Sequence, residues 1–473
     1  MLAKLMKNSV DTYYFLGIGG IGMSALARYF AAKGYRVLGY DRTPSALTKQ
    51  LEQEGIMVQY DDALDIVRTL DISSTLVVRT PAVPEDTPVY VYLRGAGFSI
   101  LKRAEVLGHL TRRERALCVA GTHGKTTTST MLAHLLHGSH LSCSAFLGGI
   151  SNNYHTNLLI DKSSDLVVVE ADEYDRSFHH LTPYISVITS MDPDHLDIYG
   201  TEQSYYDSFA HYASLVTHAL VVKKGLEGRL SQSSASVYTY AVEGNADFVA
   251  RNVRYDNGVI VFDLHIGVQT EEVISGMRLC VPVWVNVENS VAALAVGYLL
   301  GMTEAELRAG LESFAGVYRR FNMHVNTPSV SYVDDYAHHP QELEASIESV
   351  RRLYPDRRLL VVFQPHLFSR TRDFADGFAR VLSEADSLLL LPIYPARELP
   401  IEGVTSEWLL SLLPQHGAAA QVVEKAQLVS RISEIVQAWN ASGEPCVVMT
   451  LGAGDIDRLV SDIKQNLTIY EQS

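Results

Sequence analysis

Residues 116–128 read Ala-Leu-Cys-Val-Ala-Gly-Thr-His-Gly-Lys-Thr-Thr-Thr, an apolar run followed by a glycine turn and then by Lys125-Thr126. The pattern predicts a strand, a turn and a helix that begins at the lysine. Backbone N–H groups at such a helix start bind phosphate oxygens, a lysine adds positive charge, and a threonine hydroxyl can contact magnesium. The strict phosphate loop would have glycine at Val119. We still predict a phosphate site formed by Gly121, Thr122, His123, Gly124, Lys125, Thr126 and Thr127.

A second glycine turn lies near the N-terminus. Gly17, Gly19 and Gly22 form G-x-G-x-x-G after an expected strand at Thr12–Leu16, and a second expected strand ends at Asp41. This is the dinucleotide-binding pattern, which alone indicates an NAD-dependent oxidoreductase. A hydride-transfer enzyme needs no separate triphosphate loop, however. We therefore favour a diphosphate sugar nucleotide at this loop and ATP at the other, and keep the oxidoreductase as the alternative.

Composition indicates a cytoplasmic, multidomain enzyme. The 473 residues are 47% hydrophobic, enough for about two to four domains with large cores. No run of about eighteen apolar residues predicts a membrane span. The four cysteines have no metal or disulfide spacing, as expected for reduced thiols. The net charge of −15 argues against nucleic acid as a partner, so a polyanionic substrate needs local cations.

Strands and helices alternate in three consecutive blocks, which predicts an α/β protein of three domains, each built on a mainly parallel sheet. The domains are a Rossmann-like domain (1–107), a P-loop ATPase domain (108–316) with a β-rich stretch around a 256–258 hairpin turn, and a second Rossmann-like domain (317–473). The strands and helices expected outside the two loops include Arg36–Tyr40, Thr75–Arg79, Leu166–Val169, Ile185–Thr189, Val330–Asp334, Pro340–Leu353, Leu359–Phe363, Phe374–Ala385, Ser387–Leu391 and Cys446–Leu451.

Titratable residues gather where these strands end, which is where open parallel sheets bind ligands. Glu170 closes an apolar strand and begins an acidic run, so we expect it to hold magnesium opposite the phosphate loop. His195 follows the next strand between acids, and we expect it to be a second metal ligand rather than a structural histidine.

Two later groups of residues have two interpretations each, and two runs of titratable residues have one. Asn286 and Asn289 open a helix and could face a purine, or serve as an N-cap and a surface residue. Arg320, beside Arg319, could reach a γ-phosphate or be solvated. The runs 334–340 and 364–372 place many titratable groups at two strand ends, which packing explains poorly. The glycine turn at 452–454 is expected to be structural.

Taken in order, the motifs resemble those of the Mur ligases of bacterial cell-wall synthesis. The resemblance covers about Gly17 to Asp455 and rests on the ordered set G-I-G-G-I-G-M, G-T-H-G-K-T-T-T, E-A-D-E-x-D, D-P-D-H-L-D, N-x-x-N-x-x-A-A, R-R-F, D-D-Y-A-H-H-P and F-Q-P-H. It implies a UDP-sugar domain, a central ATPase and a C-terminal domain for the amino acid. It further implies ligation of L-alanine to the lactyl carboxylate of UDP-N-acetylmuramate through an acyl phosphate, with ATP as co-substrate and two magnesium ions, in peptidoglycan precursor synthesis.

The resemblance also assigns residues. Lys125, His195, Arg320 and His338 would be catalytic, and Thr126, Glu170 and His195 would hold the metals. The phosphate loop, Asn286, Asn289, Arg320 and Asp335 would bind ATP. The UDP-sugar would contact Gly17, Gly19, Gly20, Gly22, Asp41, Thr80, Arg103 and His123, and L-alanine would contact Tyr336, His338, Arg370 and Arg372.

Two departures refine this interpretation. Leu367 stands where many alanine-adding relatives carry arginine, so Arg370 or Arg372 would have to compensate. No lysine occurs in 205–220, which excludes the carbamylated-lysine metal ligand of relatives that add later residues. A relative that attaches a recycled peptide to the same sugar remains the nearest alternative. Oligomeric state, a homodimer included, is left open by the sequence.

Overall fold

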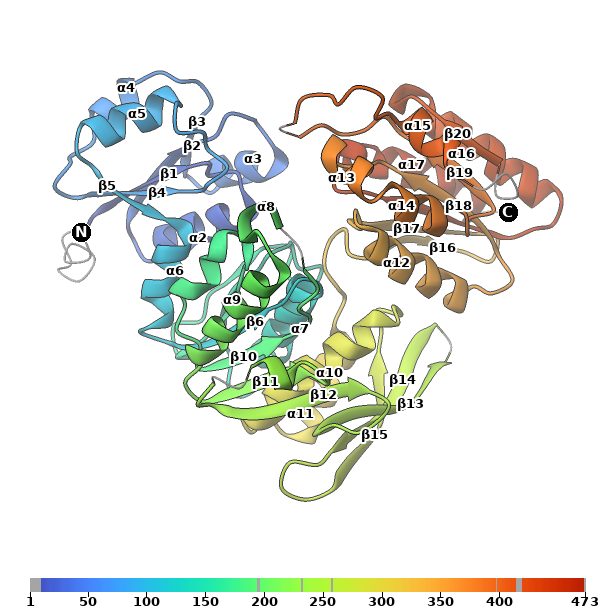
Figure 1. Ribbon diagram of the computed structural model, residues 1–473, viewed down its shortest axis with the longest axis horizontal. Helices are drawn as coiled ribbons and strands as arrows, with labels where there is room; N and C mark the ends of the chain where they lie inside the picture. Colours follow the sequence, from blue (N-terminus) through green and yellow to red (C-terminus); the bar gives the residue numbers. More distant parts are fainter. Residues whose placement is uncertain are drawn as a thin grey trace. The chain divides into compact units, whose positions relative to one another are not determined.

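The computed structural model describes residues 10–193, 196–230, 233–256, 258–396, 398–413 and 419–471. Within them the chain forms three separate sheets (Figure 1). The backbone divides into two compact units. The first contains residues up to 253 with 262–278 and 288–315, and the second contains 254–261, 279–287 and everything from 316 onward. The predicted α/β class with three mainly parallel sheets is confirmed.

The first sheet has five strands in the order β3-β2-β1-β4-β5, and all neighbours are parallel. Strand β1 (Thr12–Leu16) is buried along its whole length because its side chains are apolar or aromatic apart from Thr12. It lies between β2 and β4, so the strand order reverses at the glycine loop that follows it. The remaining bounds are β2 Arg36–Tyr40, β3 Met57–Gln59, β4 Thr75–Arg79, β5 Ser99–Lys102, α2 Ile21–Ala32, α3 Ala46–Gln53, α4 Asp65–Arg68, α5 Pro88–Gly95 and α6 Arg103–Thr111.

The boundary that we predicted at residue 107 falls inside α6, which runs on without a break to Thr111. One hydrophobic cluster joins this helix and α2 to the next sheet. It contains Phe30 and Leu107 as well as Cys118 and Val169. The two sheets of the first unit therefore share a core, which fixes their two glycine loops relative to each other.

The second sheet has ten strands in the order β15-β14-β13-β12-β11-β10-β6-β9-β7-β8. Its centre is β6 (Arg115–Ala120), which runs parallel to β9 on one side and to β10 on the other. The β-rich stretch extends one edge of the same sheet. The other bounds are β7 Ser144–Phe146, β8 Leu158–Leu159, β9 Leu166–Glu170, β10 Ile185–Ile188, β11 Ala219–Lys223, β12 Ser236–Val242, β13 Phe248–Asp256, β14 Val259–Ile266 and β15 Glu272–Leu279.

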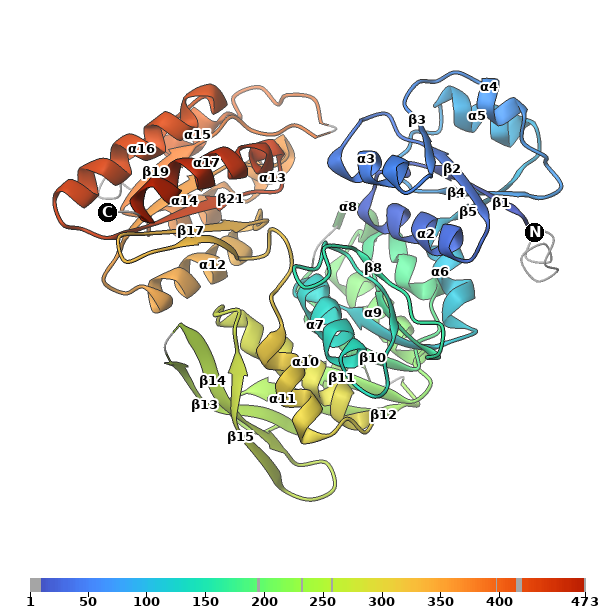
Figure 2. The same ribbon diagram turned by 180° about the vertical axis from the view of Figure 1, so that it is seen from behind.

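The helices of this region bring distant parts of the sequence together. Helix α7 (Lys125–His137) begins at the predicted lysine and packs on β6, β9 and α11. Figure 2 shows α11 beside α7. Its residues from Thr128 to Leu136 are all buried. The others are α8 Leu196–Tyr199, α9 Glu202–Ser214, α10 Val285–Leu299, α11 Glu304–Ser313 and the 3-10 turns η1 Tyr174–His180 and η2 Glu227–Arg229.

The third sheet has six strands in the order β16-β17-β21-β18-β19-β20, parallel except for β16 at the edge. Helix α12 (Pro340–Leu353) starts at its proline and has the predicted bounds. The others are β16 Asn322–Asn326, β17 Val330–Asp335, β18 Arg358–Phe363, β19 Ser387–Leu390, β20 Ala419–Val422, β21 Cys446–Leu451, α13 Phe368–Asp373, α14 Ala375–Leu382, α15 Ser406–Ser411, α16 Lys425–Ala441, α17 Val460–Leu467, η3 Asp455–Leu459 and η4 Thr468–Glu471.

The third predicted glycine turn is structural. Gln364 fills it, donating to Asp455 at 2.9 Å and accepting from the N–H of Ile456 at 2.9 Å. No helix in the described ranges has the length and hydropathy that a membrane crossing needs.

Candidate functional site

The phosphate loop is a tight turn between β6 and α7. Gly124 caps the helix in the left-handed conformation, with φ +81°, which side chains rarely adopt. A Cβ there would also lie 2.7 Å from Oδ1 of Asn289. At Gly121, with φ +135°, a Cβ would overlap the hydroxyl of Thr189. Both glycines are therefore required by the close approach of neighbouring elements, and the loop's N–H groups lie at the start of α7.

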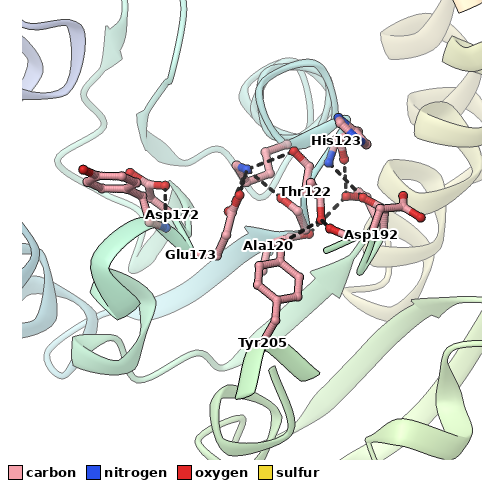
Figure 3. Close-up of polar contacts among 12 residues, drawn as sticks. Ala120, Thr122, His123, Asp172, Glu173, Asp192 and Tyr205 are labelled. Carbon is pink, nitrogen blue, oxygen red and sulfur yellow. Dashed lines mark hydrogen bonds and ion pairs between the residues drawn. The ribbon is translucent and has the colours of Figure 1, made fainter. Parts of the chain in front are cut away.

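The loop is tied to the end of β10. The Thr122 hydroxyl donates to the carbonyl of Asp192 and lies 2.7 Å from the Tyr205 hydroxyl on α9, and the backbone N–H of His123 donates to Ser190 at 2.8 Å (Figure 3). Tyr205 is fully buried. These bonds set the position of the loop before any phosphate binds.

Lys125 is the charged group of the loop and is itself held by protein groups. Its ammonium donates to both carboxylate oxygens of Glu173, at 2.7 and 2.9 Å, and to the carbonyl of Gly121 at 2.6 Å. Burial alone would lower the pKa of Lys125, but the carboxylates of Glu173, Asp172 and Glu170 raise it above its usual value. The lysine is therefore a fixed positive charge at the mouth of the loop.

Glu170 lies at the carboxyl end of β9, next to the strand that leads into the loop. Its Oε2 is buried and accepts no hydrogen bond from any described residue. Gly148 approaches it so closely that a Cβ there would overlap the carboxylate. An orphaned carboxylate oxygen beside a phosphate loop fits a hard cation such as Mg²⁺, and the hydroxyl of Thr126, the second residue of α7, is a further oxygen ligand of the right type.

The second metal ligand that we predicted, His195, lies outside the described residues. Within the ranges that the structure covers, no group of three or more His, Cys, Asp or Glu residues could hold a metal ion. The metal assignments therefore stay predictions.

Asn289 belongs to the same neighbourhood as the phosphate loop. Its Oδ1 accepts from the hydroxyl of Thr128 at 3.1 Å and faces Gly124. Asn286 lies three residues earlier in α10, and both amides are only 6% exposed. The predicted helix start is confirmed, whereas the simple surface reading of Asn286 and Asn289 is wrong.

The first glycine loop collects the side chains predicted for it. A Cβ at Gly17 would lie 2.5 Å from Thr80, and the N–H of Gly19 donates to Asp41 at 2.8 Å. The guanidinium of Arg103, the first residue of α6, covers Gly22 so closely that a Cβ there would overlap it. Gly20 differs, since the nearest atom to its Cβ would be 3.5 Å away. Thr80, Asp41 and Arg103 thus surround one loop although they follow three different strands.

A cationic and aromatic cluster forms at the strand ends of the third sheet. Arg320 stacks on Tyr336 at 5.1 Å, and the rings of Tyr336 and His338 lie 5.4 Å apart. The His338 ring lies 5.9 Å from that of His366, and Nη1 of Arg370 is 3.4 Å from Nδ1 of His366. Burial lowers the pKa of His338, and it lowers that of His366 to about 4. Both histidines are neutral at pH 7, so Arg320 and Arg370 carry the positive charge of this cluster, and Glu342, 3.2 Å from Nδ1 of His338, is a nearby carboxylate.

Arg372, Arg319 and Asp335 lie next to this cluster and each has another partner, although the Arg319 guanidinium also lies 5.3 Å from the centre of the Tyr336 ring. Arg372 is 51% exposed and pairs with Asp373 at 2.7 Å. Arg319 is buried and pairs with Asp334 at 3.2 Å. Asp335 binds the hydroxyl of Ser346, and burial raises its pKa to about 6. The structure therefore puts Arg370, and not Arg372, among the residues predicted for L-alanine.

Leu367 caps α13 with a left-handed φ of +71°. Its N–H donates to the carbonyl of Tyr394 at 2.9 Å. Glu398 accepts from the N–H of Ser369, the second residue of this helix, at 2.9 Å. The helix that carries Arg370 is therefore held by Tyr394 and Glu398.

Nearly the whole chain matches known protein families. Residues 12–115 match the Mur ligase family catalytic domain, 119–297 the Mur ligase middle domain, and 319–454 the glutamate ligase domain of Mur ligases. The UDP-N-acetylmuramate–L-alanine ligase of Porphyromonas gingivalis strain W83 is 53% identical over 462 residues, which is 96% of this chain and 98% of that protein. The chain belongs to the Mur ligase family.

Other comparisons place this Mur ligase within the family. The UDP-N-acetylmuramate–L-alanine ligase of Phocaeicola vulgatus is 50% identical over 461 residues, covering 96% of this chain and 98% of that one. The solved UDP-N-acetylmuramate–alanine ligase of Thermotoga maritima has a TM-score of 0.80 at 27% identity, over 98% and 99% of the two chains. A murein peptide ligase from Psychrobacter arcticus has a TM-score of 0.68 at 22% identity over 97% and 98% of the chains, and so shares the fold.

Sequence analysis missed three partners of this Mur ligase's site. Glu173 binds Lys125, Tyr205 holds Thr122, and His366 lies beside Arg370. Glu173 and His366 lie in the E-A-D-E-x-D and F-Q-P-H motifs, so the sequence pointed to these residues but not to the residues that they contact. Tyr205 gives no signal in the sequence, since a buried tyrosine on an amphipathic helix reads as core.

Proposed function

We propose that this Mur ligase joins L-alanine to UDP-N-acetylmuramate and converts ATP to ADP and phosphate. The observation that carries the proposal is the pair of glycine loops in one compact unit, one closed by Arg103 and one containing Lys125. Relatives that match nearly the whole chain and are named for this reaction support it. The reaction supplies the precursor of the peptide part of peptidoglycan.

The proposed chemistry has two displacements. A lactyl carboxylate oxygen attacks the γ-phosphorus of ATP, and ADP leaves. The L-alanine nitrogen then attacks the acyl carbon of this mixed anhydride, phosphate leaves, and the nitrogen loses its proton. Activation is needed because a carboxylate would otherwise have to expel oxide. Lys125, fixed at the start of α7, stabilises the charge that develops on the transferred phosphoryl group.

The other proposed roles concern the binding of ATP and the neutralisation of its negative charge. Gly121–Thr127 bind the ATP phosphates, with Asn286, Asn289 and Asp335 at the nucleoside and Arg320 at the phosphates. Thr126 and Glu170 would hold Mg²⁺, which when bound supplies positive charge to the phosphate oxygens, and His195 would hold a second ion. Both metal assignments and the cytoplasmic location, where ATP and UDP-sugars are found, are part of the proposal.

The two substrates have separate sites in this proposal. Gly17, Gly19, Gly20, Gly22, Asp41, Thr80 and Arg103 contact the UDP moiety, and His123 faces the sugar. The L-alanine carboxylate is held by Arg370, since a planar guanidinium matches a carboxylate and Arg372 pairs with Asp373 instead. Tyr336 and His338 surround the amino acid.

The alternatives have less support. The solved murein peptide ligase shares the fold alone, whereas the alanine-adding relatives are half identical in sequence. An NAD-dependent oxidoreductase has no use for a lysine-containing phosphate loop.

An ADP-release assay tests the proposal. With UDP-N-acetylmuramate and magnesium ATP, we expect L-alanine to be the best acceptor, glycine to be poorer, and the tripeptide L-alanyl-γ-D-glutamyl-meso-diaminopimelate to be inactive. A methylene in a small pocket discriminates by about 1–3 kcal/mol. Preferred use of the tripeptide would move the assignment to the peptide-adding reaction, and loss of NADH absorbance with no ADP release would restore the oxidoreductase.

A further inference from the structure

One short acidic segment pairs with Arg103 at the first glycine loop, with Lys125 at the second, and with Lys102, the residue before Arg103. We call residues 172–175 the acidic strap. Oδ2 of Asp172 lies 3.5 Å from the guanidinium of Arg103. Glu173 binds Lys125 at 2.7 Å, and Asp175 binds Lys102 at 2.9 Å. In Figure 3, Glu173 extends from the strap to the phosphate loop and Asp172 lies farther from that loop.

The strap is held unequally at its two sides. The side chains of Glu173 and Lys125 are 3% and 13% exposed. Those of Asp172 and Arg103 are 38% and 26% exposed, and those of Asp175 and Lys102 are 38% and 54% exposed. Because exposed ion pairs are weak and buried ones resist separation, the pairs with Arg103 and Lys102 are the ones that a competing anion breaks first.

The backbone at the end of the strap is strained. Asp175 and Arg176 have φ values of +51° and +54°, and consecutive left-handed residues other than glycine are uncommon. Arg176 stacks on Tyr199 at 4.7 Å, and the Tyr199 hydroxyl donates to the carbonyl of Glu173 at 2.5 Å. Such a conformation persists only where its surroundings hold it, so loss of the Lys102 and Arg103 contacts lets the segment shift.

We propose that the acidic strap couples the two loops, so that an anionic ligand at the first glycine loop strengthens nucleotide binding at the second. The inference rests on the proposed function, which puts a UDP-sugar diphosphate beside Arg103. That diphosphate competes with Asp172 and Asp175 for Arg103 and Lys102. The released strap holds Glu173 less firmly against Lys125, and the ammonium becomes available to the ATP phosphates. By linkage, nucleotide strengthens UDP-sugar binding by the same factor.

Calorimetric titration of the full chain with the ATP analogue AMP-PNP and magnesium, with and without saturating UDP-N-acetylmuramate, measures this coupling. We expect the sugar nucleotide to lower the Kd for AMP-PNP by about fivefold. In the double variant Asp172→Asn/Asp175→Asn, we expect AMP-PNP alone to bind several-fold more tightly and the coupling to fall below about twofold. Because the removal of carboxylate charge near Lys125 also favours an anion by charge alone, the loss of coupling, and not the tighter binding, is the result specific to the strap.

Asp165→Asn is the matched control. It breaks an exposed ion pair with Arg115 at 2.7 Å, at the opposite end of β9, and should keep the wild-type coupling. If the double variant does not fold, Lys102→Met replaces it. This change removes the ion pair with Asp175 by altering the lysine instead of the strap, and we expect it to weaken the coupling. Wild-type protein that binds both ligands independently, or strap variants with unchanged coupling, would overturn the proposal. Failure of wild-type protein to bind UDP-N-acetylmuramate would instead overturn the proposed function along with it.

Discussion

The two glycine loops share a strand–glycine–helix pattern but keep their positive charge in different places. In the second loop the cation is Lys125, the first residue of α7, only 13% exposed and paired with Glu173. Residues 17–23 of the first loop include no lysine or arginine. Its cation is Arg103, which reaches Gly22 from the start of α6.

This difference teaches what each loop can do. A cation fixed at the helix start can stabilise the negative charge that develops on a transferred phosphoryl group, because the cation need not move during the reaction. A cation that arrives from another helix suits a diphosphate that is bound and left intact. In the proposed function, the same backbone pattern therefore serves catalysis in one loop and recognition in the other.

The largest expected effect comes from removing the cation of the second loop. Lys125→Ala should lower kcat by about 10²–10³-fold, since a preorganised charge at the transferring phosphoryl is lost. Lys223→Ala is the control. Lys223 ends β11 of the same sheet, is half-exposed and pairs with Glu288 on α10. ADP release measures both variants, and retention of more than about a tenth of wild-type turnover would exclude the assigned role.

The next effect concerns the orphaned carboxylate oxygen near the same loop. Glu170→Gln should raise the magnesium concentration needed for half-maximal activity by about tenfold or more, because an amide is a poorer ligand than a carboxylate. Magnesium dependence of AMP-PNP binding provides a readout independent of turnover. An unchanged magnesium curve would mean that Glu170 is not a ligand.

The C-terminal cluster predicts a smaller effect, confined to one substrate. Arg370→Lys should raise the KM for L-alanine by about tenfold, or about 1.4 kcal/mol, because the planar fork is lost. The same change at Arg372, which pairs with Asp373, should leave that KM within about twofold. Equal effects of the two variants would show that the structure does not separate their roles.

The smallest effect is expected in the first loop. A Cβ at Gly20 would meet its neighbours only at ordinary contact distance, so Gly20→Val should preserve the fold and raise only the KM for the UDP-sugar, by several-fold. Gly95→Val is the control, because a Cβ at Gly95, the last residue of α5, would meet no atom within 4 Å. A normal KM in the Gly20 variant would show that the diphosphate does not approach this backbone.

Local sequence predicted the elements that apolar runs and glycines define. The bounds of β1, β2, β4, β21 and α12 agree with the prediction, because turn residues flank their buried positions. Pairings across the chain could not be predicted, since they depend on packing. Glu173 meets Lys125 across 48 residues, and His366 meets Tyr394 through a bridge between separate loops. The continuity of α6 beyond residue 107 was hidden for the same reason.

The central claim is that the two loops bind different ligands, and calorimetry on two variants tests it most directly. Wild-type protein, Gly20→Val and Lys125→Ala are each titrated with UDP-N-acetylmuramate and with magnesium AMP-PNP. We predict that the glycine variant loses affinity for the sugar nucleotide alone and the lysine variant for AMP-PNP alone, apart from the coupling between the sites. The account would be contradicted if one variant lost affinity for both ligands while the other lost affinity for neither. Binding of NADH in place of UDP-N-acetylmuramate would also contradict it.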